Sequence, residues 1–503
     1  MKRSTKPGLA QRLAAGLAGT LLLLAACGPA AAGQCQSSGP RPDRIPGLAI
    51  GGGAEDFHGE VLLGLNDGLD SLLLTQHGPF RFARRLPPGH AYQVKVLHHP
   101  PIQRCTVEHG SGLALGDVAD LRVRCVDGSI RTIAAEADEL ADVGDIGPLT
   151  EDAQGNLYAV AGRGGQQGHG GVLRIARDGS RTLLHAFTGP DADDLPYRLA
   201  LSADGTLLYG VTSRGGEHDE GTVFRLRTDG SGFQTLHSFG GHSAGCAAVP
   251  SSALLRASDG RYYGVCASGG TWGGGVLYRI DPQGHYRQVQ AFVNSQDIGA
   301  LAAPEAVEPD AQGLHFPLGE IVEHPDGVLY GTARYGGLHG NGGVYAYRLQ
   351  DERGGALAHM PEHALAPQGG LALGRDGRLL GYTRRDLQQV SMLFRAATDG
   401  TMQIYRIDPG LTGIMRPGGV PQQGCDGLIY GADSSGGAHG QGSIFSIDLE
   451  SGQALTRYSF GGQNRGRMGF APEHGLLLAA DGDLYGSTRR GGPASGGAVF
   501  RID

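Results

Sequence analysis

Short apolar runs separated by glycine-rich turns cover most of the chain after residue 128. Runs such as "RTLLHAF" (181–187), "GTVFRL" (221–226) and "QTLHSF" (234–239) have the length and the branched and aromatic residues of β-strands. Asp-Gly pairs stand between many of these runs. Such pairs favour the tight turn of a β-hairpin, because both turn residues take positive φ. The pattern predicts an all-β structure made of hairpins.

The hairpins belong to a repeat of about fifty residues. Each copy reads as strand, Asp-Gly turn, a second strand beginning "LYG", a Gly-Gly loop, a third strand, another Asp-Gly turn and a fourth strand. The copies align on one column: Tyr158, Tyr209, Tyr263, Tyr330, Leu380, Tyr430 and Tyr485. A proline precedes the turn glycine by ten positions in five copies, at Pro250, Pro317, Pro367, Pro417 and Pro472. Seven copies of four strands predict a seven-bladed β-propeller over 128–503.

The two ends of this region complete each other. The last copy stops at "GGAVFRID" (496–503), after its third strand, and "DGSIRTIAAEA" (127–137) precedes the first copy and matches the fourth-strand segment "DGSRTLLHAF" (178–187). We expect the strand at 129–135 to pair with the last blade. That pairing would close the ring and cover a sheet edge that otherwise invites aggregation.

Glycine-rich stretches such as "LYGTARYGGLHGNGGVYAYRL" (329–349) also raise the question of a phosphate-binding loop. That loop lies between a strand and a helix and commonly carries Lys-Ser or Lys-Thr. This stretch has neither feature. The glycines are interpreted as turn and loop residues of the repeat.

A smaller strand-rich region, 45–127, comes before the propeller. In "AYQVKVL" (91–97) and "LRVRC" (121–125) apolar and polar residues alternate, which is typical of strands with one buried face. Turn signals such as "NDG" (66–68) and "PPG" (87–89) separate the strands. The region is predicted to be a small antiparallel β-sandwich.

The first 26 residues have the form of a secretory signal peptide. A basic start is followed by the apolar stretch 13–26, which is too short to cross a membrane as a helix. The stretch ends in "LAAC", with Cys27 last, and resembles a bacterial lipobox, which implies cleavage before Cys27 and acylation of that residue. Residues 27–44 would then be a tether. The glycine at position 28, where sorting signals place Asp, favours the outer membrane by resemblance.

Six cysteines remain after Cys27: Cys35, Cys105, Cys125, Cys246, Cys266 and Cys425. An exported protein meets an oxidising compartment, so disulfides are expected, and the pairs Cys105/Cys125 and Cys246/Cys266 are close in sequence. Each would close a loop of about twenty residues, worth roughly 3 kcal/mol. Cys35 and Cys425 have no evident partner, and none of the spacings is the CxxC of a zinc site.

Two family resemblances follow from these segments. The stretch from "GPFRFARRLPPGHAYQVKVLHHPPIQRC" to "LRVRC" (78–125) resembles a module of bacterial lipoproteins, which implies a Cys105–Cys125 bridge and a role as spacer or stalk. The unit "LYGxTxxGGxxxxGTVFRLxxDGxxxxTLHSF" resembles the GloVer tandem repeat of choice-of-anchor bacterial proteins. Copy five departs from it, because "RDLQQVSMLFRAATDG" (385–400) lacks the Gly-Gly pair. The resemblance implies a surface propeller without a defined molecular function.

The charge and composition of the chain limit the classes of partner that we expect. The chain has a formal net charge of −8, and its leader contributes four basic residues and no acid, so the remainder is more acidic still. An acidic chain without a basic run argues against a nucleic-acid partner. We expect membrane contact through the lipid anchor only, no cofactor, no metal, and an envelope protein or polysaccharide as partner.

Candidate recognition residues lie in the Gly-Gly loops. His218, His339 and His439 share one offset, His169 stands two positions later, and Trp272, the one tryptophan, could stack on a sugar or a partner side chain. Solvated loop histidines and a packed tryptophan are the alternatives. The insertion 293–316 is a further place for recognition or a tolerated surface loop.

Carboxylates near the first strands could line the channel and act as a pair in glycoside cleavage: Glu151, Asp152, Glu320, Glu323 and Glu473. They do not recur in register, and no serine-nucleophile, HExxH or P-loop motif is present, so no catalytic residue is assigned. The favoured hypothesis is a non-catalytic binding or scaffold protein of the envelope. The alternatives are an envelope carbohydrate hydrolase or lyase and a purely structural surface protein.

Overall fold

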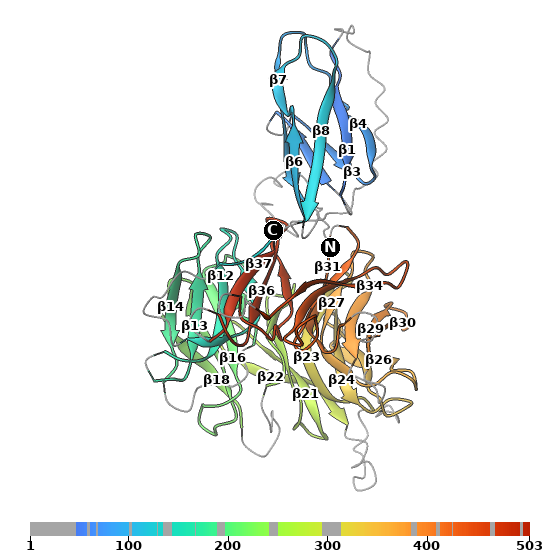
Figure 1. Cartoon of the computed structure of the whole chain (residues 1–503). Coiled ribbons are helices and arrows are strands. Elements are labelled where there is room, and N and C mark those ends of the chain that lie inside the picture. Colours follow the sequence, from blue (N-terminus) through green and yellow to red (C-terminus); the bar gives the residue numbers. More distant parts are fainter. Residues whose placement is uncertain are drawn as a thin grey trace, which may run out of the picture.

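The computed structural model describes residues 47–57, 61–66, 69–99, 103–127, 129–133, 143–165, 167–188, 197–240, 250–293, 313–383, 390–408, 413–424, 426–462, 468–492 and 496–502. The elements in these ranges are β-strands, β1 to β37. They form a narrow body, β1–β8, that stands on a broad ring of sheets (Figure 1). The all-β propeller fold predicted from the sequence is confirmed.

The narrow body, called the sandwich below, has two sheets with strand orders β4-β1-β8-β6 and β3-β2-β5-β7. The strands are β1 (Ile50–Glu55), β2 (Val61–Leu65), β3 (Asp70–Leu74), β4 (Gly78–Arg81), β5 (Ala91–His98), β6 (Gln103–Glu108), β7 (Ser111–Leu113) and β8 (Val118–Asp127). Along β5 and β8 the apolar positions of the alternating pattern, such as Tyr92, Val94, Leu121 and Val123, face the core.

Seven further sheets, each called a blade, make up the ring. Blade one contains β10 (Gly144–Ile146), β11 (Thr150–Glu151), β12 (Leu157–Arg163), β13 (Gly171–Ile175) and β14 (Arg181–Ala186). Blade two contains β15 (Ala200–Leu201), β16 (Leu207–Thr212), β17 (Thr222–Arg227) and β18 (Gln234–Ser238). Blade three contains β19 (Leu255–Arg256), β20 (Tyr262–Cys266), β21 (Gly273–Ile280) and β22 (Tyr286–Val293). Blade four contains β23 (His315–His324), β24 (Val328–Tyr335), β25 (Gly343–Arg348) and β26 (Arg353–His359).

The remaining blades follow the same order along the chain, except for the last. Blade five contains β27 (Pro367–Leu373), β28 (Leu379–Thr383), β29 (Ser391–Ala396) and β30 (Met402–Ile407). Blade six contains β31 (Pro417–Gln423), β32 (Ile429–Asp433), β33 (Ser443–Ile447) and β34 (Ala454–Ser459). Blade seven contains β35 (Leu476–Leu478), β36 (Leu484–Thr488), β37 (Ala498–Ile502) and, from the other end of the chain, β9 (Ile130–Thr132).

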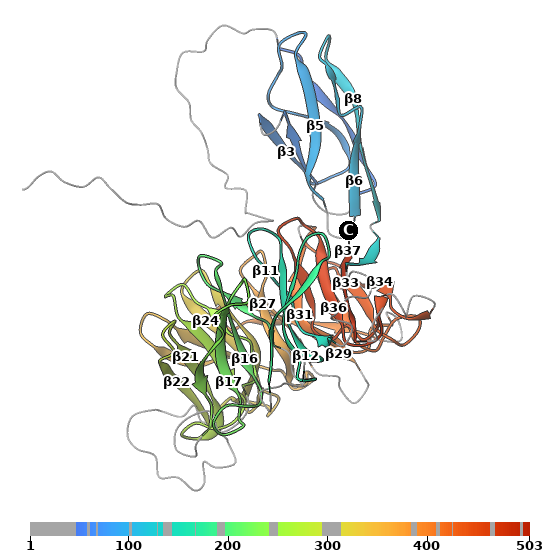
Figure 2. The same cartoon turned by 90° about the vertical axis from the view of Figure 1, so that its left-hand side faces the viewer.

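Strand β9 closes the ring. It pairs antiparallel with β37, matching Ile130 with Ile502 and Thr132 with Phe500, so an early segment supplies the fourth strand of the last blade. The segment predicted for this role, 129–135, contains β9. Figure 2 shows the chain passing from the sandwich into the red C-terminal blade at this point.

The hydrophobic cores of the ring lie between blades. Each of seven clusters combines residues of two adjacent blades, and one of them joins Val499 of blade seven to Ile146, Leu157 and Leu173 of blade one. Middle strands such as β32 and β33 are buried along their whole length, which explains why these runs are apolar without alternation. The ring is therefore held together by burial between every pair of neighbours, including the last and the first.

The repeated Asp-Gly-x-x-Tyr motif has a physical explanation. The turn glycine takes positive φ, as at Gly260 (82°), and the tyrosine four residues after the aspartate donates its hydroxyl to that carboxylate. The distances are 2.8 Å for Tyr263 to Asp259 and 2.8 Å for Tyr485 to Asp481. The motif thus places a large buried ring between blades and satisfies its polar end.

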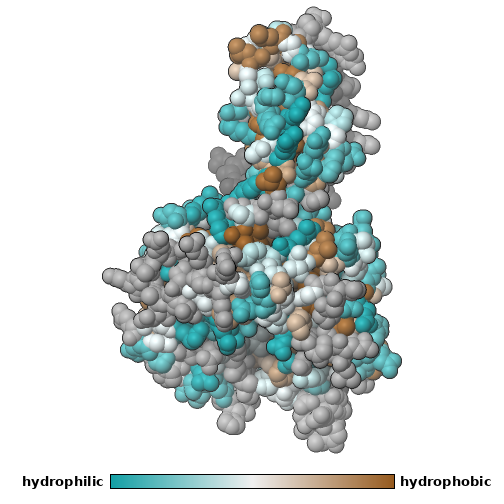
Figure 3. Space-filling view, viewed as in Figure 1, coloured by the Kyte–Doolittle hydropathy of each residue, from teal (hydrophilic) through white to brown (hydrophobic). Residues whose placement is uncertain are grey.

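One end of the sandwich contacts the ring, and the other points away from it. At the contact, Arg104 of β6 donates to Asp483 of blade seven at 2.9 Å, and the Asp483 side chain is only 3% exposed. Hydrophobic side chains gather at the far end (Figure 3).

No helix in the described ranges is long and apolar enough to cross a membrane.

Candidate functional site

The first strand of each blade lines the channel. These strands lie side by side around the ring, β23 next to β27, β27 next to β31 and β31 next to β35. They approach closely at glycines with positive φ: a Cβ added at Gly319 would lie 2.2 Å from the carbonyl carbon of Gly369, and one at Gly419 would lie 2.4 Å from the nitrogen of Gly475. The repeated proline and glycine near the start of these strands therefore make a tight channel wall.

Blades one and seven break that pattern with ionisable residues. Asp145 stands where most other blades have the proline, and Glu473 and His474 follow Pro472 of blade seven. Gly144, the residue before Asp145, pairs with Arg163 at the end of β12. The Gly-Gly loop of blade one begins directly after Arg163. These charged residues therefore lie at the mouth of the channel on the face formed by the Gly-Gly loops, called the Gly-loop face below.

Asp145 is the centre of this group. It is 3% exposed, and its backbone holds a positive φ of 56°, fixed by a hydrogen bond from its N–H to Gly496 O at 2.8 Å. Its carboxylate lies 3.3 Å from Arg489 Nε and 3.9 Å from His474 Nε2. Arg489 reaches in the other direction to Glu473, with NH1 3.0 Å from Oε2. We call Asp145, Glu473, His474 and Arg489 the seam cluster, because it spans the seam between blades seven and one.

The electrostatics keep Asp145 ionised. Burial alone would raise its pKa, but His474, Arg489 and Arg163 outweigh burial and lower the pKa below the usual value. The same ion pairs raise the pKa of Arg489, despite the opposing effect of burial. The pair of Asp145 and Arg489 is therefore a fixed pair of opposite charges at neutral pH.

A second ion pair spans the channel wall. Arg198 of blade two donates from Nε to Oε1 of Glu320 in blade four at 3.1 Å, and both side chains are about a quarter exposed. Blade three lies between them and contributes the small Ala253 at the equivalent position, which leaves room for the pair.

Blade four adds an aromatic group to the same mouth. Phe316 and Tyr335 pack with ring centroids 5.6 Å apart, and the guanidinium of Arg334 lies 5.9 and 5.8 Å from the two rings. Tyr335 is 40% exposed. His315 pairs in register with Tyr335 at the end of β24, so this group also belongs to the Gly-loop face. We call Phe316, Arg334 and Tyr335 the aromatic cluster.

The two clusters offer complementary chemistry. Paired carboxylates and guanidinium groups donate and accept hydrogen bonds in fixed directions, and a half-exposed aromatic ring provides an apolar face. Blade four is three blades away from both blade seven and blade one, so the clusters lie on opposite sides of the mouth. An extended polar ligand with apolar faces could contact both.

The recognition residues predicted from the sequence do not converge. His218, His339 and His439 are exposed on blades two, four and six, and Trp272 is half-buried on blade three. The rings of His218 and His439 lie over glycines after the fourth strand of their own blades, Gly240 and Gly462. Across the described ranges, no group of three or more His, Cys, Asp or Glu residues could hold a metal ion.

The five carboxylates predicted near the channel divide into two groups. Glu320 and Glu473 take part in the channel ion pairs described above. Glu151 and Glu323 instead accept backbone N–H bonds from the preceding blade, from Ala480 at 2.8 Å and from Ser258 at 2.7 Å. Asp152 accepts hydrogen bonds within its own turn and from Tyr158.

Sequence reasoning did not identify Asp145, Arg198, His474 or Arg489. A usable signal exists in the aligned repeats for two of them, because Asp145 stands where five other copies have proline and His474 stands where four other copies have glycine. Arg489 shares its column with Arg334 and Arg384, so the repeat alone does not single it out.

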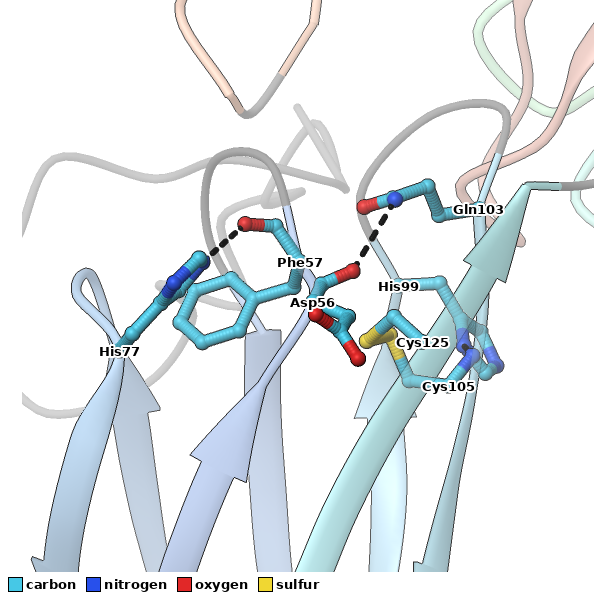
Figure 4. Close-up of a disulfide and its surroundings, with 7 residues drawn as sticks. All are labelled: Asp56, Phe57, His77, His99, Gln103, Cys105 and Cys125. Atoms are coloured by element: carbon cyan, nitrogen blue, oxygen red, sulfur yellow. Dashed lines mark hydrogen bonds between the residues drawn. A yellow bond between two sulfur atoms is a disulfide. The ribbon is translucent and has the colours of Figure 1, made fainter.

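The cysteines fall partly outside the described residues. Cys105 and Cys125 are joined by a disulfide between the paired strands β6 and β8, at the sandwich end that faces the propeller (Figure 4). Nearby, His77 contacts the carbonyl oxygen of Phe57, and Gln103 donates to that of Asp56. Cys266 is disulfide-bonded, while Cys246 lies outside the described residues, as do Cys27, Cys35, Cys425 and the insertion segment 294–312.

The repeat sequence identifies the family. The sequence profile of the Gloeobacter/Verrucomicrobia repeat matches residues 145–388 and 366–503, which together cover most of the chain. The chain therefore belongs to this family of repeat β-propellers. No curated protein sequence matches it significantly.

Similar solved structures are propellers of low sequence identity. TolB from Acinetobacter baumannii aligns with a TM-score of 0.36 and 13% identity, over 62% of this chain and 66% of TolB. Oligogalacturonate lyase from Vibrio parahaemolyticus aligns with a TM-score of 0.44 and 10% identity, over 75% of this chain and 96% of the lyase. At these values the similarity concerns the fold alone.

Proposed function

We propose that this protein is an exported, lipid-anchored β-propeller that binds a polysaccharide of the bacterial envelope or cell surface without cleaving it. In this proposal Cys27 carries the lipid in the outer membrane, and the Gly-loop face of the propeller takes the ligand. The leader and the lipobox-like "LAAC" support the anchor. The two clusters at the channel mouth support the binding face.

The ionised state of Asp145 carries the non-catalytic part of the proposal. Glycoside cleavage needs a carboxylic acid that holds a proton near neutral pH, so its pKa must be raised. Asp145 has a lowered pKa and is tied to Arg489, and Glu473 is tied to the same guanidinium. Such carboxylates suit hydrogen bonding to sugar hydroxyls better than proton transfer.

The aromatic cluster supports a carbohydrate over a protein partner. A flat ring covers the apolar face of a sugar, and the neighbouring guanidinium binds hydroxyl or carboxylate groups. Arg334 is half-buried, and its buried Nε makes no hydrogen bond within the described residues.

The test measures binding of the soluble chain 28–503 to a panel of glycans and to detergent-solubilised envelope. Tyr335→Ala should weaken glycan binding by about tenfold, which corresponds to about 1.4 kcal/mol. Tyr335→Phe keeps the ring and should bind as the parent does. A captured glycan that is shortened during incubation would support the hydrolase or lyase alternative. Capture of an envelope protein alone would contradict the carbohydrate assignment, and no capture would favour the structural alternative.

A further inference from the structure

The far end of the sandwich combines two features that no other part of the described chain shares. It exposes three leucines, with Leu69 38%, Leu113 62% and Leu115 81% exposed. It is also where the described chain begins, at Gly47. We propose that this end, called the tip, is a membrane-contact surface that rests in the headgroup region of the bilayer holding the lipid anchor. The proposal rests on the anchor at Cys27 proposed above.

Strand directions place both features at one end. Strand β8 runs toward the propeller, and β1 is parallel to β8, so β1 begins at the far end. Leu48 pairs with Leu86 there, and Ala49 N–H donates to the Asp117 carboxylate at 2.8 Å. Strand β7 pairs Leu113 with Ala91, the first residue of β5, and Ala114 then exchanges backbone hydrogen bonds with Gly89 and His90. Figure 3 shows the hydrophobic side chains gathered at this end.

The exposed leucines are costly in water and favourable in a lipid interface. Leu113 and Leu115 lie on either side of Ala114, which is fully buried, so the backbone of the tip is held while both side chains project outward. Apolar side chains on a fixed loop suit insertion to the depth of the headgroups. Burial of the two leucines would add to the membrane affinity that the acyl chains on Cys27 supply.

The polar residues at the tip are compatible with phospholipid headgroups. Arg85 donates from NH1 to Gly47 O at 2.9 Å, and Arg84 is exposed beside it. Among the described residues at this end, the carboxylates of Asp70 and Asp117 accept backbone N–H groups, Asp70 from Ser71 and Arg84, and Asp117 from Ala49. Asp120 near the start of β8 is exposed and lies 3.6 Å from His109 Nδ1. The arginine side chains are placed to contact phosphate.

Geometry links the tip to the anchor. Residues 28–46 join the acylated cysteine to Gly47, so the tip is the described part of the chain closest to the lipid along the backbone. A tip held against the bilayer directs the propeller, at the opposite end of the sandwich, away from the membrane (Figure 1).

The experiment uses the acylated full chain in vesicles of phosphatidylethanolamine and phosphatidylglycerol, with Trp272→Phe as background. Leu115→Trp then gives a single tryptophan at the tip, and Leu338→Trp, at a position 58% exposed on the propeller, is the matched control. We expect a blue-shifted emission and strong quenching by brominated lipid for Leu115→Trp, and neither effect for Leu338→Trp.

The possible outcomes distinguish a failure of the membrane-contact proposal from a failure of the proposed lipid anchor. Chains that float with the vesicles but leave Leu115→Trp unquenched would overturn the membrane contact and leave the anchor standing. Chains that do not float would overturn the anchor itself. In the unacylated chain 28–503, Leu113→Ser with Leu115→Ser should lower vesicle partitioning at least tenfold. If the two substitutions instead convert a dimer in solution to a monomer and leave vesicle partitioning unchanged, the tip binds a second copy of the chain and the proposal is wrong.

Discussion

At the residue scale, equivalent positions of the repeat differ in their ionisation. Asp259 and Asp426 are the turn aspartates of blades three and six, and both accept a tyrosine hydroxyl. Burial raises the pKa of Asp426 to about 6. Burial also acts on Asp259, but hydrogen bonds from the backbone and guanidinium of Arg261 outweigh it and lower the pKa. The deeper burial of Asp426 and the arginine next to the turn of Asp259 together give the two pKa shifts opposite signs.

This difference predicts opposite pH dependences. Asp426 binds more protons in the folded than in the unfolded chain between about pH 4 and pH 6, so its contribution to the free energy of unfolding falls as the pH rises through that range. Asp426→Asn should therefore gain roughly 2 kcal/mol relative to the parent between these pH values. Calorimetric unfolding midpoints measure this gain.

Asp259→Asn is the matched comparison. Its aspartate has a lowered pKa, so the parent's stabilisation is present above about pH 4 and is lost on acidification. The variant should be less stable than the parent at neutral pH and should approach it in acid. If the stability of both variants relative to the parent changed with pH in the same direction, the opposite pKa shifts of Asp426 and Asp259 would be contradicted.

At the element scale, neighbouring blades are braced by a repeated contact. In one blade, the side chain of the residue four positions before the turn glycine accepts a hydrogen bond. The donor is a backbone N–H of the preceding blade, two positions before the turn glycine of that blade. The pairs are Glu151 with Ala480, Glu323 with Ser258, and Gln423 with Arg375. The brace fixes the relative rotation of adjacent blades on the Asp-Gly turn face.

The brace between blades three and four can be removed cleanly. Glu323 accepts hydrogen bonds from both N–H and Oγ of Ser258, so Glu323→Ala should cost about 1 kcal/mol and lower the unfolding midpoint. Glu323→Gln keeps an acceptor oxygen and should retain most of the stability. Equal loss in both variants would indicate that the charge, not the hydrogen bond, is what matters.

Elements were more predictable than the site, for a physical reason. A hairpin of the propeller is specified within about ten residues, because the Asp-Gly turn, the apolar run and the tyrosine that returns to the aspartate are all local. The seam cluster has no such local signal: Asp145 and Arg489 are 344 residues apart and meet only when the ring closes. The aromatic cluster is similar, since Phe316 and Tyr335 belong to different strands and match no repeated column.

At the scale of the whole molecule, stability depends on the closing strand. Ile130 of β9 packs into the core between blades six and seven, and β9 covers the edge of β37. A chain of residues 143–503 lacks this strand, whereas a chain of residues 129–503 keeps it, and both lack the sandwich. The shorter chain should unfold at lower temperature and self-associate through its open edge.

Light scattering after size separation and calorimetry would measure both effects. Equal midpoints and equal monomer fractions for the two chains would show that β37 does not need its partner. The comparison isolates the closing strand, because the two chains differ only in residues 129–142.

The route of the chain from sandwich to ring also has a mechanical consequence. Any pull between a membrane anchor and a ligand on the propeller passes through β8 into β9, and β9 is held to β37 by three residue pairs, those of Ile130, Arg131 and Thr132. The strand that completes the ring is thus also the strand that bears the load. Under tension the molecule would yield first at blade seven, where the seam cluster also lies, so force on the tether would reach the channel mouth before it disturbed the other blades.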